Sequence, residues 1–574
     1  MFTIFTVQTT TLSSISVYCF DLGGNFNMCT HGLLCSLSPF CKRFGFAHCI
    51  ACVRIRIRQD GINQLIMQRI LLCCVLAFTL FSCQEELISP VEANGPEDVQ
   101  TPLTKSEINK IVEEHLFATD DVFDWNETTN LVVWSAINLS ENHASLGYQP
   151  AGYQNIEETI HEIDVTAGAW KTTRDELVND LLEATERLTG EAISEEDLFV
   201  YEEDGVLPIL DVKVLHPGII EEFRTRPDVR YLEPSNYNAA EVDLRSGSGC
   251  SEAPSSNVNT SDYTTISPGA KMPWNYAYMN IPQAWARSQG DNIGIAIIDT
   301  GVYPTQSKLG SSFSSGWSTG RYISKYGTYE PSWWSSRTDG PNDQCGHGTQ
   351  MAGLAAGPRT SSGSTVGVAY KANLVTYRAT SDVIVNGSKE KKGVKNALVA
   401  IGNRSDVKIV SMSIGDVFSS GTVKDGIRYA NNRGKLILCA AGTSLSWTSW
   451  WGVIFPANMS ETTAVTGVRS GSPMQRCNTC HDGSKVDFVA VMQRSWDTDR
   501  TSLTLSRYNN TPGYVGGSSA ATATTAGIAA LVWATNPSQS RSQVLNRMKQ
   551  AASIYPGRSG NFGWGIIDAN QATQ

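Results

Sequence analysis

Apolar residues in the second half of the chain gather in short continuous runs, with segments of helical spacing between them. Such runs are typical of strands in a parallel sheet that is buried on both faces. The clearest are 293–298, 407–413 and 435–441. Helical spacing recurs in 394–402 and 422–432. This alternation predicts an α/β fold over residues 271–574, a doubly wound parallel sheet whose ligands bind at the carboxyl ends of its strands.

The segment before this domain has shorter, amphipathic elements. Thr104 and Glu107 form a capping box ahead of apolar positions at helical spacing as far as Leu116. A second box at residues 173–176 predicts the start of a helix that Gly190 ends.

A hairpin, a short helix and a final strand are predicted to follow that helix. The pattern places them at 198–201 with 207–215, at 219–224 and at 227–234. Together with an earlier strand that the pattern does not locate, this order predicts a small α+β unit of split β-α-β topology over residues 104–240. Residues 241–270 are rich in Ser, Gly, Asn and Pro and predict a linker.

The beginning of the chain does not have the pattern of folded protein. Residues 1–66 hold six of the fourteen cysteines and show no amphipathic period. We interpret them as an over-extended reading frame ahead of a true start at Met67. Residues 67–83 have the layout of a signal peptide, with a short charged start, an apolar run and a small residue, and the run is too short to span a bilayer. The polar, acidic residues 84–103 predict a tether.

Charge narrows the range of partners. The formal net charge is −11 and the isoelectric point is near 5.3. Binding to nucleic acid requires a basic surface, and the chain contains no basic run. We therefore expect no nucleic acid partner.

Three short segments carry the residue types of a nucleophilic hydrolase. Asp299 lies in Asp-Thr-Gly, His347 in Gly-His-Gly-Thr and Ser519 in Gly-Gly-Ser-Ser-Ala. Asp-Thr-Gly also marks aspartic proteases, but these need two facing carboxylates, and the motif has no second copy here. Each motif alone has an ordinary structural explanation, whereas the order Asp, His, Ser is one of the known chain orders of a catalytic triad. All three segments resemble those of the subtilisin-like serine peptidases, the subtilase family.

This resemblance implies a serine endopeptidase that cleaves peptides or proteins through an acyl-enzyme. Ser519 would attack, His347 would take its proton and Asp299 would orient His347. The family pattern aligns Ser518 beside the nucleophile and Asp343 four residues before His347.

Two further segments resemble parts of the same family. Ser413, Ile414 and Gly415 resemble the strand that pairs with the substrate backbone. An ordinary strand end is the alternative and is compatible with the same residues. Residues 104–240 resemble the inhibitory propeptide, which implies a self-processing zymogen with its own propeptide as a partner. An unrelated α+β domain is the alternative for that segment.

The end of the signal segment resembles the lipobox of bacterial lipoproteins. The resemblance rests on Leu-Phe-Ser-Cys at 80–83 and implies that Cys83 is lipidated. We then expect an exported protein that is anchored to membrane lipid at the bacterial outer membrane or cell surface. A plain secretory signal with a buried cysteine is the alternative and implies a secreted protein.

One position departs from the family in a way that bears on activity. Thr443 stands where subtilases have the asparagine whose side chain donates to the oxyanion. A catalytically weak, peptide-binding relative of the same fold is therefore the alternative function. Trp447, Trp450, Trp451 and residues 456–457 are expected near the pocket for the cleaved residue. The family resemblance implies no required cofactor; calcium is common in the family, but no motif locates a site, and no metal ligands are assigned.

The remaining cysteines leave several structures open. Cys477 and Cys480 with His481 match a haem attachment motif and half of a zinc site, but their complement is missing, so a small disulfide loop is expected. Cys439 lies in an apolar run and predicts a buried free thiol. Whether Cys250 and Cys345 pair is left open by the sequence.

Overall fold

The computed structural model describes the backbone of residues 3–8, 14–20 and 26–29, and then residues 101–119, 121–239, 250, 258–331, 337–442, 452–507 and 510–574. The chain divides into two compact units, Met1–Glu97 and Asp98–Gln574. In the first unit β1 (Thr3–Gln8), β2 (Ser14–Phe20) and β3 (Phe26–Cys29) form an antiparallel sheet, in a stretch where the sequence predicted no element. The predicted signal peptide and Cys83 lie outside the described residues.

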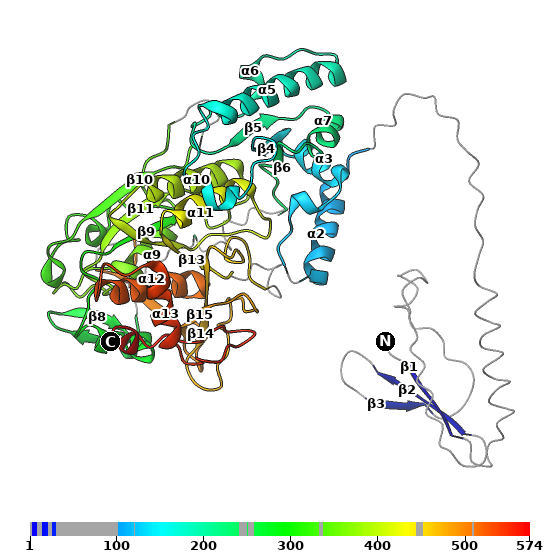
Figure 1. Cartoon of the computed structure of the whole chain (residues 1–574). Coiled ribbons are helices and arrows are strands. Elements are labelled where there is room, and N and C mark those ends of the chain that lie inside the picture. Colours follow the sequence, from blue (N-terminus) through cyan, green and yellow to red (C-terminus); the bar gives the residue numbers. More distant parts are fainter. Residues whose placement is uncertain are drawn as a thin grey trace. The chain divides into compact units, whose positions relative to one another are not determined.

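The centre of the second unit is a sheet of seven parallel strands in the order β10-β11-β9-β12-β13-β14-β15 (Figure 1). Its strands are β9 (Gly294–Asp299), β10 (Ile323–Gly327), β11 (Asn373–Arg378), β12 (Val407–Met412), β13 (Leu436–Ala440), β14 (Thr463–Arg469) and β15 (Phe488–Gln493). The three apolar runs of the sequence form β9, β12 and β13, which confirms the predicted doubly wound parallel sheet.

Helices cover both faces of this sheet, which is why its strands are apolar at successive positions. Ile295 and Ile297 of β9 pack into the core shared with α9 (His347–Ala356) and α12 (Gly517–Ala534). Ala296 and Ile298 pack into the core on the other face, shared with α10 (Ser388–Gly402) and α11 (Gly421–Asn432). The cover is completed by α8 (Ile281–Ala284), α13 (Arg541–Gln550) and α14 (Ala569–Ala572).

Two short hairpins extend the domain beyond the sheet. They are β7 (Tyr263–Ile266) with β8 (Ala270–Pro273), and β16 (Ser502–Leu505) with β17 (Pro512–Val515). Asp262 joins them, because its buried carboxylate accepts hydrogen bonds from Arg494, Arg500 and Tyr514. After Cys250 the described chain resumes at residue 258, so folded structure is present inside the predicted linker 241–270.

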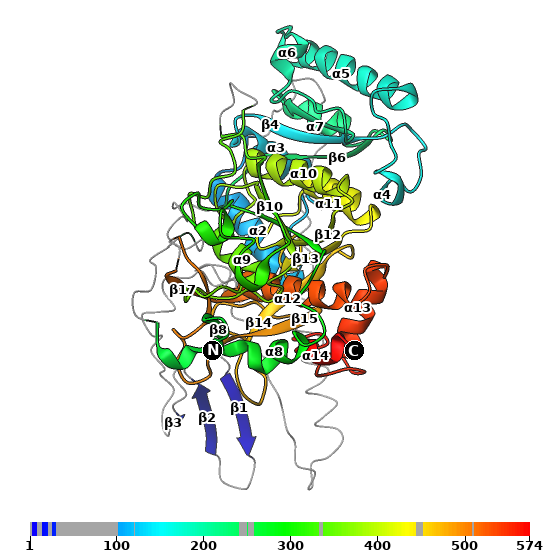
Figure 2. The same cartoon turned by 90° about the vertical axis from the view of Figure 1, so that its left-hand side faces the viewer.

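Residues 101–239 form a small α+β layer, the N-terminal layer, which packs on α10 and α11 (Figures 1 and 2). Its antiparallel sheet has the order β5-β4-β6. Its elements are α2 (Lys105–Thr119), α3 (Asn130–Asn138), β4 (His143–Tyr148), α4 (Ile156–Thr159), α5 (Gly168–Thr189), α6 (Glu195–Leu198), β5 (Ile209–Lys213), α7 (Pro217–Phe223) and β6 (Val229–Pro234). The strand that the sequence did not locate is β4, in the middle of the sheet.

Two predicted helix ends in this layer are confirmed: the start of α2 at the capping box and the end of α5 at Gly190. The capping box of Thr104 is present, with its N–H and the N–H of Glu107 each bonded to the other's side chain. Gly190 ends α5 in the left-handed conformation, at φ 78°.

Two predictions for the layer were wrong. Helix α5 begins at Gly168 and not at the box of residues 173–176, because Thr173 lies inside the helix on its buried face. The predicted strand 198–201 is reduced to one bridge between Phe199 and Val212, because Ser194 caps the short helix α6 there.

Candidate active site

The three predicted triad residues lie where strands of the sheet end or helices begin. Asp299 is the last residue of β9, near the middle of the sheet. His347 is the first residue of α9, and Ser519 lies in the first turn of α12, the helix that packs against α9. The carboxyl ends of parallel strands form the usual ligand site of such a sheet.

Asp299 and His347 form a buried pair. Nδ1 of His347 lies 2.8 Å from Oδ1 and 3.0 Å from Oδ2 of Asp299, and neither side chain is more than slightly exposed. Because a carboxylate only accepts hydrogen bonds, Nδ1 carries the proton and Nε2 is the basic nitrogen of the neutral ring. The backbone N–H of Thr300 donates to the same carboxylate at 2.8 Å.

A second carboxylate, that of Asp343, holds the loop that leads into His347. It accepts hydrogen bonds from the backbone N–H groups of Cys345, Gly346 and Thr349 and from the hydroxyls of Thr300 and Thr349, at 2.6–3.0 Å. Burial raises the pKa of Asp343, and these five donors act in the opposite direction. The Thr300 hydroxyl also accepts from the N–H of Gly348, so Asp343 fixes both β9 and α9 around the pair.

The two adjacent serines have different surroundings, which decides between them. The Ser518 side chain is fully buried and its Oγ donates to the carbonyl of Gly442 at 2.5 Å, with Thr466 Oγ1 at 3.0 Å. Residue Ser519 is 9% exposed, and its Oγ makes a long contact of 3.4 Å to the carbonyl of Ser413. Ser519 is therefore the hydroxyl that a substrate can reach.

The predicted substrate strand lies directly beside Ser519. Oγ of Ser413 donates to the carbonyl of Ser519 at 3.1 Å, and the Ile414 side chain is buried in the core on the α10 face. The backbone N–H and carbonyl of Gly415 pair with Val383 and Val385. A substrate that used Gly415 would therefore have to displace this contact.

Comparison with known proteins agrees with this arrangement. The model of the subtilase family matches residues 290–565. The thermostable alkaline protease of Halalkalibacterium halodurans is 30% identical over 307 residues, 53% of this chain and 74% of that protein. The chain belongs to the subtilase family.

The family match and the alkaline protease relative make this subtilase a subtilisin-like serine protease, a hydrolase. The minor extracellular protease Epr of Bacillus subtilis is 27% identical over 66% of this chain and 51% of its own length. The crystal structure of MycP1 from the ESX-1 type VII secretion system is 19% identical, with a TM-score of 0.42 over 55% of this chain and 89% of that chain.

The loop that carries Thr443 and the three tryptophans, residues 443–451, lies outside the described residues of the subtilase. Both flanks of the loop contact His481, whose backbone N–H donates to the carbonyl of Gly442 and whose Nδ1 donates to that of Gly452 at 3.0 Å. Gly442 has a φ of 133°, and a Cβ there would lie 2.4 Å from Nδ1 of His481. Glycine is therefore required at residue 442.

His481 is structural rather than catalytic. Burial lowers its pKa to about 4, so the ring is neutral at neutral pH. Cys477 and Cys480 beside it are joined by a disulfide, as predicted, and the bond uses both thiols that a covalently attached haem would need. Cys439 is a buried free thiol, also as predicted. Among the described residues no group of three or more His, Cys, Asp and Glu side chains forms a candidate metal site.

The pairing that the sequence left open is present in the structure. Cys250 and Cys345 form a disulfide. Cys345 precedes His347 by two residues, so the bond ties the segment after the N-terminal layer to the catalytic loop. Spacing could not have predicted this bond, because the two cysteines are 95 residues apart in sequence.

The N-terminal layer supplies groups that bind the first turns of two helices. The carboxylate of Glu233 accepts from the N–H of Gly421 at the start of α11, at 2.8 Å. Oδ1 of Asn236 lies 3.3 Å from the N–H of Ser388 at the start of α10. First-turn N–H groups have no partner within their own helix, so these contacts satisfy donors that the catalytic domain leaves unused.

The same interface contains a buried ion pair. Arg230 of the layer makes two hydrogen bonds to the carboxylate of Asp425 on α11, at 3.0 and 2.6 Å, and the Tyr231 hydroxyl adds a third. The two charged side chains are 9% and 1% exposed. Removing only one partner of such a buried pair is strongly destabilising, because the other charge then stays buried without a partner.

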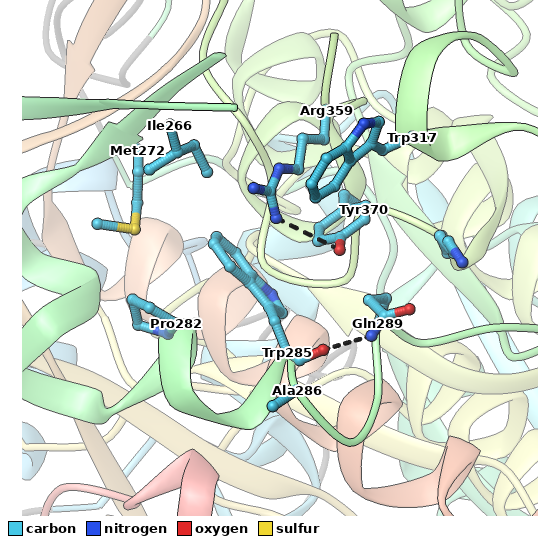
Figure 3. Close-up of a pocket in the computed structure, with 10 residues that line it drawn as sticks. Ile266, Met272, Pro282, Trp285, Ala286, Gln289, Trp317, Arg359 and Tyr370 are labelled. Carbon is cyan, nitrogen blue, oxygen red and sulfur yellow. Dashed lines mark hydrogen bonds between the residues drawn. The ribbon is translucent and has the colours of Figure 1, made fainter. Parts of the chain in front are cut away.

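A separate cavity of about 620 Å³ lies toward the amino ends of the sheet's strands (Figure 3). It is lined by Trp285 and Tyr370, and by Arg359, whose guanidinium lies 4.0 Å from the ring centre of Trp317. Its residues precede the amino ends of β9 and β11, whereas Asp299 ends β9. The cavity is therefore not the catalytic cleft.

Proposed function

We propose that this subtilase is a serine endopeptidase in which Asp299, His347 and Ser519 act as the triad. The buried hydrogen bond between Asp299 and His347 carries this proposal, because it directs the basic Nε2 away from the carboxylate. Ser519 Oγ would attack the peptide carbonyl as Nε2 takes its proton, and the resulting imidazolium would protonate the leaving amine. The N–H of Ser519, in the first turn of α12, is a donor available to the oxyanion.

A fluorophosphonate probe tests the proposed nucleophile. Such a probe reacts with an activated serine, so we expect one label on the wild-type protein, located at Ser519 by peptide mapping. N-terminal sequencing of the same sample reports where the chain has been processed. An unlabelled protein, or a label at another serine, would contradict the proposed triad.

We also propose that the N-terminal layer is the inhibitory propeptide of this protease. Its support is the interface, in which Glu233 and Asn236 bind the starts of two helices and Arg230 pairs with a buried carboxylate. The cut is expected after Tyr237, which is still packed in the layer, and before Cys250, which is joined to the catalytic loop. The new N-terminus would then stay tied beside His347.

The binding of the propeptide is expected to weaken as the pH rises. Burial raises the pKa of Glu233 to about 7 and that of Asp416 to about 6. Lys391, whose own pKa burial lowers, faces both carboxylates and donates to the carbonyl of Pro234 at 3.3 Å. The other charged groups near these three are Asp124, Asp211, Asp382, Glu390 and Lys424.

The sign follows from where the protons are bound. On dissociation Glu233, which belongs to the layer, returns to water, where the pKa of its carboxyl is near 4. At Glu233 the complex therefore holds more protons than its separated parts, so the contribution of this carboxyl to binding is greatest in acid and is lost as the pH rises through about 7. We expect the cleaved propeptide to co-elute with the protease at pH 5 and to separate at pH 8 in gel filtration. Glu233→Gln should flatten this dependence, whereas Glu222→Gln on the solvent side of α7 should not.

A catalytically weak, peptide-binding relative is the second candidate function, favoured by the threonine at residue 443. Replacing Thr443 with Asn supplies a longer donor, and loss of such a donor in subtilisin costs about 10²–10³ in kcat. We therefore expect Thr443→Asn to raise kcat with little change in KM, by no more than that range. Thr443→Val should lower kcat if the hydroxyl donates. If neither variant differs from wild type in steady-state assays, residue 443 is not an oxyanion donor.

We further propose that the protein is exported and anchored by a lipid on Cys83. The layout of residues 67–83 and a relative named an extracellular protease support export. No helix in the described part of the chain is long and apolar enough to cross a membrane. Cys83→Ala should move the protein from the membrane fraction to the soluble fraction of the envelope. Unchanged fractionation would exclude the lipid anchor. The matched control is Cys439→Ala, which removes a buried free thiol and should leave the protein in the membrane fraction.

A further inference from the structure

A short stretch of the catalytic domain, residues 417–419, is covered by backbone and side chains of the N-terminal layer. The N–H of Phe123 donates to the carbonyl of Val417 at 3.0 Å, and the carbonyl of Phe123 accepts from the N–H of Ser419 at 2.9 Å. Phe123 and Phe418 thus form an isolated parallel bridge. At this point Phe123 bonds to the catalytic domain through both of its backbone groups, as a residue of an added β-strand would.

The neighbours of Phe123 extend this contact through their side chains. The ring of Trp125 stacks on Phe418, with 5.0 Å between ring centres and 17° between planes, and Phe123 meets Phe418 edge-on at 6.0 Å. Oδ2 of Asp124 lies 2.6 Å from Nζ of Lys424, which also donates to Oγ of Ser419 at 3.2 Å. Residues 123–125 therefore present an aromatic, an acidic and an aromatic side chain to this stretch.

The covered stretch belongs to the layer's core and not to the cores of the protease. Val417 and Phe418 are buried at 4% and 3% exposure, and they pack into the cluster formed by α2, α3 and the layer's sheet. Apart from the bond between Lys424 and Ser419, the contacts described above are made by residues before 240. Departure of the propeptide would therefore expose an aromatic ring, two backbone groups and an ammonium group together.

This stretch also continues the substrate strand. The backbone of Gly415 is already paired with Val383 and Val385, and Asp416 pairs with Phe455 through both backbone groups. Past these positions, the carbonyl of Val417 and the N–H of Ser419 meet only the layer among the described residues. They are the next backbone groups along the strand that an extended peptide could use once the layer has left.

We propose that, after processing, residues 417–419 with Phe418 and Lys424 form an exosite for extended segments of protein substrates in which an acidic residue stands between two aromatic residues. The chain's own Phe-Asp-Trp at 123–125 is the template for this occupant. Backbone pairing supplies the extended conformation, Phe418 selects the aromatic residues, and Lys424 selects the acidic one. The inference rests on the proposed zymogen function, because the site is covered until the propeptide leaves.

The test uses wild-type enzyme that has processed itself, blocked with a fluorophosphonate so that it cannot cleave the probe. The probe is a fluorescein-labelled peptide with the sequence of residues 121–126, measured by fluorescence polarisation at pH 8. We expect saturable binding that weakens about tenfold or more when the peptide's tryptophan is replaced by alanine. Replacing its central aspartate by asparagine should weaken binding about twofold to fivefold, because that ion pair is partly exposed.

Variants of the enzyme locate the binding. Phe418→Ala should weaken binding about tenfold or more. Lys424→Met should weaken it about twofold to fivefold and abolish the difference between the aspartate and asparagine peptides. Lys371 lies just before the amino end of β11, away from this stretch, so Lys371→Met should leave binding unchanged. Because Lys424→Met removes only a partly exposed charge, it keeps the test decisive if Phe418→Ala folds poorly.

Each remaining outcome has a distinct meaning. Processed, probe-labelled enzyme that does not bind the peptide, or that binds it equally well in Lys424→Met and Phe418→Ala, overturns the exosite and leaves the protease function intact. A dimer of processed enzyme that Phe418→Ala disrupts identifies a second copy as the occupant and also overturns it. If the wild-type chain is neither cut nor labelled, the zymogen proposal itself is wrong.

Discussion

Replacing Ser519 with alanine is expected to abolish peptide hydrolysis and to leave the N-terminal layer joined to the protease. In subtilisin, loss of the triad serine lowers kcat by about 10⁶, and self-processing would stop with it. The measurement is the rate on a peptide substrate, together with N-terminal sequencing and gel analysis of protein made in a protease-deficient host. Substrate binding should change little, since the side chain shrinks by one oxygen.

The neighbouring serine provides the matched control. Ser518→Ala removes a buried hydroxyl that bonds to Gly442, so a loss of about 1 kcal/mol in the free energy of unfolding is expected. Processing and hydrolysis should continue, since Ser518 is fully buried. If Ser519→Ala were processed normally in that host while Ser518→Ala were not, the assignment of the nucleophile would be reversed.

Replacing Arg230 with methionine is expected to release the N-terminal layer from the protease. The substitution leaves the carboxylate of Asp425 buried without its guanidinium, which costs about 3–5 kcal/mol when one partner of a buried pair is removed. This corresponds to a loss of about 10²–10⁴ in the affinity between the two parts. Gel filtration of the processed protein at pH 5 would show the wild-type layer co-eluting with the protease and the variant layer separating from it.

Two further variants separate the interface from the stability of the layer. Arg226→Met removes an arginine whose partners, Asp180 and Asp228, both lie within the layer, and it should leave co-elution intact. A double variant, Arg230→Met with Asp425→Leu, removes both charges and should recover much of the lost affinity. Separation of the layer in Arg226→Met, or none in Arg230→Met, would show that this ion pair does not hold the interface.

Local sequence was sufficient where one stretch of chain controls its own conformation. The apolar runs predicted β9, β12 and β13 because strands buried on both faces must be apolar at successive positions. Gly190 predicted the end of α5 because only glycine adopts the left-handed conformation without strain. The predicted helix start at Thr173 was wrong. The capping-box pattern at residues 173–176 is present in the sequence, but tertiary packing buries Thr173 inside α5.

The same distinction between local sequence and tertiary packing holds for the active site. The sequence by itself determined the family, the parallel sheet and the candidates Asp299, His347 and Ser519, because their motifs place each residue beside a sharp turn at a strand or helix terminus. Only the tertiary structure gave the contacts themselves: the hydrogen bond between Asp299 and His347, the burial of Ser518 beside Ser519, and the five donors around Asp343.

The contacts between distant segments were also decided by the tertiary structure alone. The pairs Cys250 with Cys345 and Arg230 with Asp425 join residues 95 and 195 positions apart. Neither residue of either pair shows in its own neighbourhood which partner it will meet. The physical reason is that a sequence pattern reports which face of an element is buried, whereas the partner of a polar group depends on how the packed elements come together.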